Sequence, residues 1–259
     1  MPKPVAHAGF YDSLAPFKEA FSAGQPALLY HKIDWLKLGV RRRGLYISST
    51  IFRQQMHELR DAGFRSVLPG EVLATSGIGE PNTIIITFDD GFSNVLKHAT
   101  PVLTECGFRA IQFIVPGLLG QTDLWDRLDG ERPERLMDAT EIRDWLAAGH
   151  EIGAHSMSHP HLIQLSPEAA REEIVTSKKT LEDRFQRPIR DFAYPFGEFN
   201  ALTKQLVADA GFDRAWTTMP EINTENTDCF ALLRYTAMVS LRKPKYLLRS
   251  IRWCYPLSR

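Results

Sequence analysis

The sequence predicts an α/β fold built around a mainly parallel sheet, and three observations support this prediction. Short apolar runs alternate with amphipathic stretches along the 259 residues, as repeated βα units require. The length is common for a single α/β barrel. Four amphipathic stretches end at a glycine that suits the left-handed residue ending a helix, and an extended run soon follows each. These glycines are Gly63, Gly107, Gly149 and Gly211. We therefore expect one domain over residues 1–259, with a core at about 26–240.

Each expected element follows from its local pattern. Runs rich in apolar and β-branched residues predict strands at Ala27–Tyr30, Arg65–Leu68, Thr83–Phe88, Ala110–Val115, Glu151–Ala154, Ile189–Tyr194, Arg214–Thr217 and Tyr235–Ser240. Amphipathic stretches predict helices at Ser49–Ala62, Ser93–Cys106, Ala139–Ala148, Pro167–Arg184 and Asn200–Ala210. Residues 118–136, rich in Gly, Asp and Arg, predict an irregular loop over one end of the sheet.

The charge balance argues against nucleic acid as a partner. The 31 basic and 31 acidic residues cancel, so the chain has no net positive field to attract a phosphate backbone. The last part of the chain is locally basic, which indicates a solvated helix face or a contact with an anionic lipid or phosphate headgroup. Its basic residues are Arg234, Arg242, Lys243, Lys245, Arg249, Arg252 and Arg259.

Cysteine usage and the N-terminal residues give an expectation about compartment. Cys106, Cys229 and Cys254 form no CxxC pair, which argues against a disulfide framework or a thiolate metal site. Their odd number fits a reducing compartment. No apolar run long enough for a membrane span or a signal peptide is present, so we expect a cytoplasmic protein. A removed leader would leave the same pattern, so an extracytoplasmic location stays open.

The chemistry of the chain begins with two adjacent carboxylates at the end of a predicted strand. Asp89 and Asp90 directly follow Thr83–Phe88, and Gly91 permits a tight turn after them. Burying unpaired charge at the end of a core strand is costly, so each acid needs a compensating group. Side chains alternate in direction along an extended chain, which suggests different roles for the two acids.

A histidine pair supplies the first compensation. His155 and His159 are four residues apart and follow another predicted strand. Because parallel strands place their carboxyl ends on one face, these histidines and the acid pair are expected to meet there. One Asp and two His make three ligands with a position left open, which is a catalytic arrangement. Zn²⁺ suits this set best, although Co, Ni, Fe or Mn are alternatives. The second carboxylate is then placed to take a proton from metal-bound water.

A third segment, Arg190–Gly197, also reads as a strand that ends in a Pro/Gly turn. Arg190 is expected to pair with the carboxylate that does not bind metal, the alternative being an ordinary surface ion pair. The turn after Pro195 can present a backbone N–H, such as that of Phe196, to a developing oxyanion.

These segments resemble the first three motifs of the polysaccharide deacetylases, the NodB-homology group of carbohydrate esterase family 4. The matching residues are Thr87–Gly91, His155-x-x-x-His159 and Arg190-x-Phe192-x-x-Pro195-x-Gly197, and the resemblance spans about residues 27–217. It implies a distorted (β/α) barrel, usually with seven strands, and metal-dependent removal of an N-acetyl group from an amino sugar.

The resemblance also implies roles for individual residues. It makes Asp89 the general base, held by Arg190. The Phe196 amide would face the oxyanion, at a position where many relatives have Tyr. The implied metal ligands are Asp90, His155 and His159.

One motif of the family is absent from its usual place. Relatives end with Leu-x-Ile-x-His, whose histidine protonates the leaving amine, but this chain has no histidine after His161. The N-terminal strand offers Leu28-Leu29-Tyr30-His31 instead. The first and last strands of a barrel can be neighbours, so we predict His31 as the general acid, as in relatives whose last motif has moved to the first strand. The alternative is a barrel-end histidine that is hydrogen-bonded to the backbone.

The predicted function is metal-dependent hydrolysis of an N-acyl group, above all N-acetyl, on an amino sugar of a polysaccharide or glycoconjugate. The alternatives are deacylation of a lipid-linked sugar or a small non-sugar amide, and a carbohydrate-binding pseudo-enzyme. The expected partner is an N-acylated amino sugar, oligosaccharide or polysaccharide. Trp125 and Trp216 are candidates for stacking on sugar, with core packing as the alternative. Substrate choice is expected to lie in the loops at residues 118–136 and 219–229.

Overall fold

A computed structural model describes residues 10–37, 40, 43–72, 80–128 and 132–237. The last three residues of the predicted strand Tyr235–Ser240 lie outside these ranges, as does the basic segment after residue 237. Within the described residues, no helix has the length and apolar character that crossing a membrane requires.

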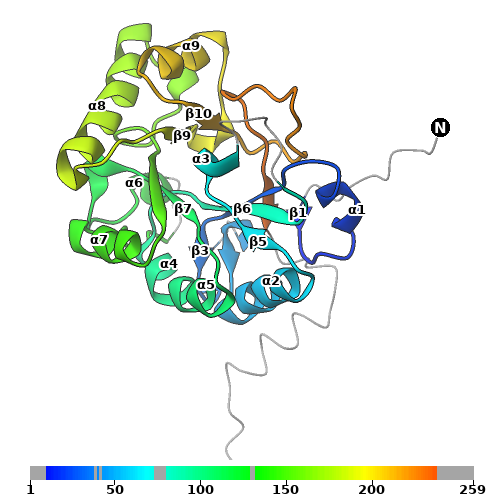
Figure 1. Cartoon of the computed structure of the whole chain (residues 1–259). Helices are drawn as coiled ribbons and strands as arrows, with labels where there is room; N and C mark the ends of the chain where they lie inside the picture. The colour runs from blue at the N-terminus through cyan, green and yellow to red at the C-terminus, as the bar shows by residue number, and fades with distance from the viewer. Residues whose placement is uncertain (1–9, 38–39, 41–42, 73–79, 129–131, 238–259) are drawn as a thin grey trace, which may run out of the picture.

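The centre of the molecule is a curled, wholly parallel sheet (Figure 1). Its strand order is β1-β11-β2-β6-β7-β8-β9-β10, and β5 pairs with β6 beside this path. The strands are β1 (Phe10–Tyr11), β2 (Ala27–Tyr30), β5 (Arg65–Ser66), β6 (Thr83–Phe88), β7 (Ile111–Ile114), β8 (Glu151–Ala154), β9 (Asp191–Ala193), β10 (Arg214–Trp216) and β11 (Tyr235–Ala237). A separate pair joins β3 (Lys32–Ile33) to β4 (Tyr46–Ile47).

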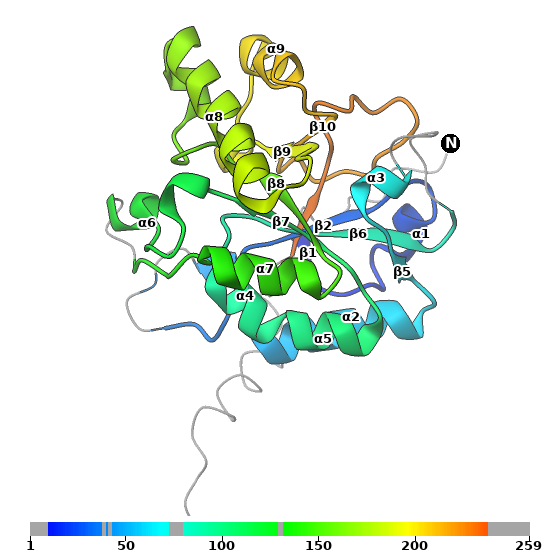
Figure 2. The same cartoon turned by 60° about the vertical axis from the view of Figure 1, so that its left-hand side comes forward.

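Helices cover the sheet, as Figures 1 and 2 show, with α8 and α9 packed together and α2 packed on α5. The α-helices are α1 (Lys18–Phe21), α2 (Ser49–Asp61), α3 (Pro69–Val72), α4 (Ser93–His98), α5 (Thr100–Cys106), α6 (Leu124–Leu128), α7 (Ala139–Ala147), α8 (Pro167–Phe185) and α9 (Ala201–Asp209). Four 3₁₀ turns are described, η1 (Arg43–Leu45), η2 (Pro116–Leu118), η3 (Leu162–Gln164) and η4 (Pro195–Gly197).

The predicted α/β fold, a distorted (β/α) barrel, is confirmed. The four predicted helix-ending glycines all have φ between +68° and +89°. A Cβ at any of them would meet no atom within 4 Å, so the backbone conformation alone requires glycine there. The β-branched run of β6 is completely buried, as predicted.

Two predictions about elements need correction. The expected helix Ser93–Cys106 is divided at Ala99 into α4 and α5, because Pro101 lacks the N–H that would continue the hydrogen-bond ladder. The stretch at 118–136 is not wholly irregular, since it contains the short helix α6 and an antiparallel bridge between Thr122 and Arg135.

The last described strand lies beside the first long one. β11 pairs with β2, at Tyr235 to Leu28 and Thr236 to Leu29. The segment that leads into β11 hydrogen-bonds with β10 at the other side of the sheet, where the N–H of Leu232 donates to Ala215 O at 2.8 Å. This one stretch of chain therefore connects the two sides of the curled sheet, and it brings the C-terminal part to the N-terminal strand.

Candidate active site

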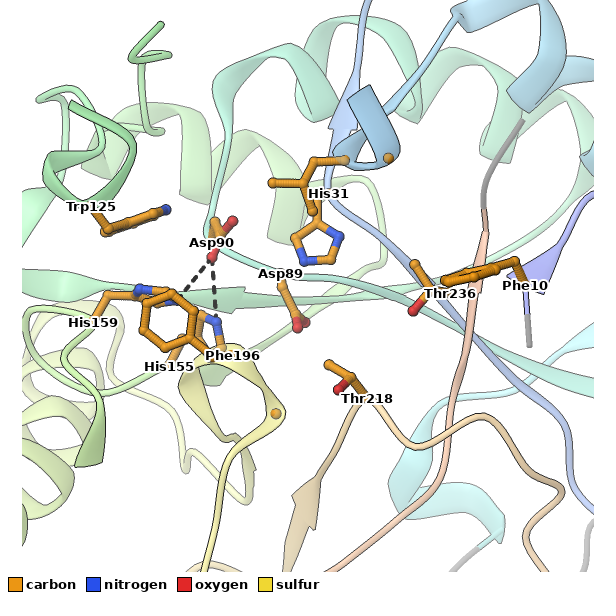
Figure 3. A pocket seen from close by; sticks show the side chains of 13 residues that line it. Phe10, His31, Asp89, Asp90, Trp125, His155, His159, Phe196, Thr218 and Thr236 are labelled. Carbon is orange, nitrogen blue, oxygen red and sulfur yellow. Dashed lines mark ion pairs between the residues drawn. The ribbon is translucent and has the colours of Figure 1, made fainter. Parts of the chain in front are cut away.

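A pocket of about 390 Å³ opens where the carboxyl ends of the strands meet (Figure 3). The predicted residues at its wall follow several strands: His31 follows β2, Asp89 and Asp90 follow β6, and His155 follows β8. The full lining is Phe10, His31, Gly44, Leu45, Asp89, Asp90, Trp125, His155, His159, Phe196, Gly197, Thr218 and Thr236. Parallel strand order thus gathers residues that are far apart in the sequence.

The three predicted metal ligands form a compact, buried group. Asp90 Oδ1 lies 3.3 Å from His155 Nε2 and 3.4 Å from His159 Nε2. Metal–ligand bonds of about 2.1 Å in a tetrahedron place neighbouring donor atoms about 3.4 Å apart. These two distances, with all three donor atoms within 4.8 Å of one another, are compatible with the binding of a single divalent ion.

Metal binding requires an ionised carboxylate and neutral imidazoles, and the free group meets this requirement in part. Burial would lower the pKa of His155, but its hydrogen bond to Asp90 and the nearby carboxylates offset this and raise it. Burial by itself would raise the pKa of Asp90, but the neighbouring histidines His155 and His159 offset it and lower that pKa below its usual value. Burial lowers the pKa of His159 to about 3, so this ring is neutral at physiological pH.

The two histidines are oriented in different ways. His155 Nδ1 lies 2.8 Å from the carbonyl oxygen of Ala193 in β9, an arrangement that fixes the ring and leaves Nε2 free to bind. Within the described structure, His159 Nδ1 has no hydrogen-bond partner. The His159 ring instead packs against the rings of Trp125 and Phe196, with centroids 4.0 and 4.6 Å away.

Backbone strain concentrates at this pocket. Of the non-glycine residues with positive φ among the described residues, Asp90 (74°), Ser156 (59°), His159 (64°) and Phe196 (60°) all belong to the motif segments. Such conformations cost about 1–3 kcal/mol each and persist only where the surroundings hold them. Their clustering marks the region as a functional site rather than ordinary barrel packing.

Asp89 is held by an arginine that the sequence analysis did not assign. Arg234 Nη1 donates to Asp89 Oδ1 at 2.7 Å and Nη2 donates to Oδ2 at 2.8 Å, a bidentate pair. Both side chains are buried. Burial would raise the pKa of Asp89, but Arg234, together with smaller effects of His155 and His31, offsets this and lowers it. Asp89 is therefore ionised and fixed in orientation, as a general base must be.

The predicted pair of Arg190 with Asp89 is wrong. Arg190 precedes β9, so it lies at the opposite end of the strand from the pocket. Its side chain is 60% exposed and pairs with Asp213, which precedes β10, at 2.9 Å. The prediction that Arg234 belongs to a solvated basic face is also wrong, because this residue is completely buried just before β11. The rest of the basic segment lies outside the described residues.

His31 lies at the pocket wall, with its ring near both acids (Figure 3). In the part of the chain that the structure describes, no backbone group hydrogen-bonds to the ring, which disfavours the alternative of a backbone-bonded histidine. Burial lowers the pKa of His31, and the carboxylates of Asp90 and Asp89 offset this only in part. The neutral ring is thus the main form in the free site at neutral pH. Its role as general acid remains a prediction.

Phe196 brings both its backbone and its ring to the pocket. Among the described residues, no acceptor is found for the Phe196 N–H, so it is available to a ligand. The ring is stacked on His161 with centroids 3.9 Å apart and planes 9° apart. His161 Nδ1 in turn lies 2.8 Å from Glu198 Oε2. The available N–H agrees with the predicted oxyanion contact, which stays a prediction.

The two tryptophans differ in position. Trp125 lines the pocket beside His159, whereas Trp216 is completely buried and donates to Asp191 Oδ1 at 3.0 Å. Stacking of Trp216 on a sugar is therefore excluded. Phe10, Thr218 and Thr236 at the wall were missed by the sequence analysis, because nothing in their local sequence marks them.

A parallel α/β barrel that gathers an Asp-His-His group, which could hold a metal ion, and a second, arginine-held carboxylate indicates a hydrolase. The chain belongs to the polysaccharide deacetylase family, since the model of that family matches residues 76–215. The predicted membership is thereby confirmed, and so is the prediction of an enzyme, a hydrolase acting on an amide bond.

Individual relatives agree with this assignment. YxkH of Bacillus subtilis (strain 168) is 25% identical over 226 residues, which cover 86% of this chain and 75% of YxkH. The poly-beta-1,6-N-acetyl-D-glucosamine N-deacetylase of Staphylococcus aureus (strain N315) is 22% identical over 193 residues, which cover 73% of this chain and 66% of that enzyme.

Solved structures show the same fold. The Streptococcus pyogenes deacetylase PplD, in complex with acetate, superposes with a TM-score of 0.74 at 22% identity, covering 88% of this chain and 97% of PplD. IcaB from Ammonifex degensii gives a TM-score of 0.71 at 21% identity, with the same coverage of both chains.

Proposed function

We propose that this protein removes the N-acetyl group from an amino sugar within a polysaccharide, an N-acetylglucosamine polymer being the first candidate, with the help of one divalent metal ion. The observation that carries the proposal is the meeting of the Asp90–His155–His159 group with the Arg234-held Asp89 in one pocket. The relatives whose names state a polysaccharide substrate support the choice of polymer.

The metal would be held by Asp90, His155 and His159, whose donor atoms fit Zn²⁺. When bound, such an ion polarises the amide carbonyl and lowers the pKa of a water molecule. The protein's own contribution begins with Asp89. Its ionised carboxylate takes a proton from the water whose oxygen forms the new bond to the carbonyl carbon. Arg234 keeps that carboxylate ionised and aimed.

Two further groups complete the reaction. The Phe196 N–H donates to the carbonyl oxygen as negative charge develops there. His31 then gives a proton to the amide nitrogen as the C–N bond breaks, so that the products are a carboxylate and a free amine. His31 is neutral in the free site, so it takes up a proton from solvent as negative charge develops nearby and raises the pKa of its imidazole. After the C–N bond has broken, Asp89 releases to solvent the proton that it took from water.

The test is acetate release from N-acetylglucosamine oligomers by the purified protein, with and without bound metal. We expect about one divalent ion per chain, lost with activity in Asp90→Ala and in the His155→Ala/His159→Ala pair. Full activity of the metal-free wild type would overturn the mechanism. His31→Asn should lower turnover by about 10²-fold or more while retaining metal. His98→Asn, on α4 outside the pocket, is the control.

A further inference from the structure

The turn between the two histidines needs support from outside itself. It runs from His155 to His159 and contains two left-handed non-glycine residues, Ser156 and His159, with φ of 59° and 64°. Within the turn, the His159 N–H donates to Ser156 Oγ at 3.0 Å. A turn with this much unfavourable backbone conformation relaxes unless its surroundings hold it.

A single side chain of helix α8 supplies much of that support. Glu173 Oε2 accepts from the backbone N–H groups of Met157 and Ser158, both at 2.9 Å. Glu173 Oε1 accepts from Ser158 Oγ at 2.6 Å. The carboxylate therefore fastens the two residues at the middle of the turn, between the predicted metal ligands. It lines no part of the pocket and has no place in the proposed reaction.

The other side of the same turn rests on η2. The Gly117 N–H donates to the Met157 carbonyl oxygen at 3.0 Å, and a Cβ at Gly117 would lie 2.5 Å from that oxygen. Both backbone groups of Met157 are thus held: its N–H by Glu173 and its carbonyl oxygen by the Gly117 N–H.

The consequence falls mainly on His159. The His155 ring has its own orienting contact with the Ala193 carbonyl, whereas His159 Nδ1 has no partner among the described residues. The position of the His159 ring therefore depends on ring packing and on the backbone of the turn. A loss of the Glu173 contacts would leave His155 oriented and His159 loosely placed.

We propose that Glu173 is a positioning residue for the metal site, acting through the turn that carries His159. This inference rests on the proposed metal-dependent function. Helix α8, which lies outside the pocket, would then keep His159 in place. The Glu173 carboxylate does this by accepting hydrogen bonds from backbone N–H groups, and it does not itself bind the metal or the substrate.

The experiment measures Zn²⁺ affinity of the metal-free, full-length protein by competition with a chelator. Loss of a contact that orients ligands typically weakens metal binding by about 10- to 100-fold, and we expect this for Glu173→Ala. Glu173→Gln should bind nearly as tightly as wild type, because one amide oxygen can accept from both N–H groups. Glu172→Ala, an exposed neighbour on the same helix, is the matched control for loss of one negative charge.

A second readout separates positioning from general stability. The visible absorption spectrum of bound Co²⁺ reports ligand geometry, and it should change in Glu173→Ala but not in Glu172→Ala. Wild-type Zn²⁺ affinity in Glu173→Ala, measured well below its unfolding temperature, would overturn the inference. So would an equal loss in Glu173→Gln, which would point to charge instead of hydrogen bonding. A wild type that binds no divalent ion would instead overturn the proposed metal-dependent function.

Discussion

Arg234 is the residue on which the reactivity of the acid pair depends. Arg234 donates two hydrogen bonds to Asp89, and both side chains are buried. Removing one partner of a buried pair leaves an uncompensated charge, which the other relieves by changing its protonation state. Without Arg234, burial would raise the pKa of Asp89 and weaken it as an acceptor of protons at neutral pH.

We therefore predict that Arg234→Met lowers turnover by about 10²-fold or more, the contribution expected of a general base. Metal content should be retained, because Asp90, His155 and His159 are unchanged. Arg190→Met is the control, since its exposed pair with Asp213 is worth at most about 1 kcal/mol and lies at the other end of the barrel. Kinetics with oligomeric substrate and thermal unfolding of both variants check the prediction. Equal activity of the two variants would contradict it.

At the residue scale, the residues marked by their local sequence could be predicted, and those placed by long-range contacts could not. Asp89, Asp90, His155 and His159 were predicted because chemistry and local sequence coincide, with strand ends and a four-residue spacing marking them. Arg234 was not, because its partner lies 145 positions away and its neighbours suggest a basic surface. Arg190 was misplaced because the motif pattern did not show at which end of β9 it lies.

At the scale of elements, a buried cluster of one ammonium and two carboxyl groups fixes the short helix α6. Lys32 Nζ, in β3, pairs with Asp123 at 3.3 Å and with Asp126, and all three side chains are at most 2% exposed. The ammonium group also lies over the ring of Phe92, 4.5 Å from its centroid. A five-residue helix has little stability of its own, so this cluster holds α6 and with it Trp125, beside His159.

Lys32→Met should accordingly lower the free energy of unfolding by about 3–5 kcal/mol, because it removes the cation from a buried ion-pair cluster. Urea denaturation measures this change. The triple variant Lys32→Met/Asp123→Asn/Asp126→Asn removes all three ionisable groups and should recover much of the loss. Lys179→Met, on the exposed face of α8, should change stability by about 0.5 kcal/mol or less. A Lys32→Met protein as stable as Lys179→Met would disprove the importance of the cluster.

Element boundaries were largely predictable because they depend on local sequence. The exact agreement of β2, β6 and β8 with their predicted ranges reflects apolar runs bounded by polar or glycine residues. The division into α4 and α5 could have been inferred from Pro101. The helix α6 could not, since long-range pairing with Lys32 holds it in place and its own sequence resembles a loop.

For the whole molecule, a buried histidine links stability to pH. His150 is 2% exposed, its ring packs on Trp145 at 4.0 Å, and Nδ1 accepts from the Ala110 N–H at 3.3 Å. Burial, with a smaller effect from Arg109, lowers its pKa to about 4. The unfolded chain then takes up a proton at this residue, near its ordinary pKa of 6.5, before the folded protein does.

Folding stability should therefore fall as pH decreases from about 6.5 to 4, by on the order of 3 kcal/mol from this residue, and should be unaffected by His150 above that window. His150→Asn keeps an acceptor near the Ala110 N–H and removes the titration, so its stability should change less over the same pH range. Denaturation of metal-free wild type and variant at several pH values gives the comparison. Parallel pH dependences of the two proteins would rule out this role of His150.

The place of β11 between β1 and β2 has a consequence for the order in which the protein is made. During translation, the acid pair and both histidines emerge well before the segment with Arg234. A nascent chain that ends before this segment holds the catalytic carboxylate without its guanidinium partner and a sheet without the strand beside β2. The candidate site thus becomes complete only after β11 has been synthesised and has taken its position between β1 and β2.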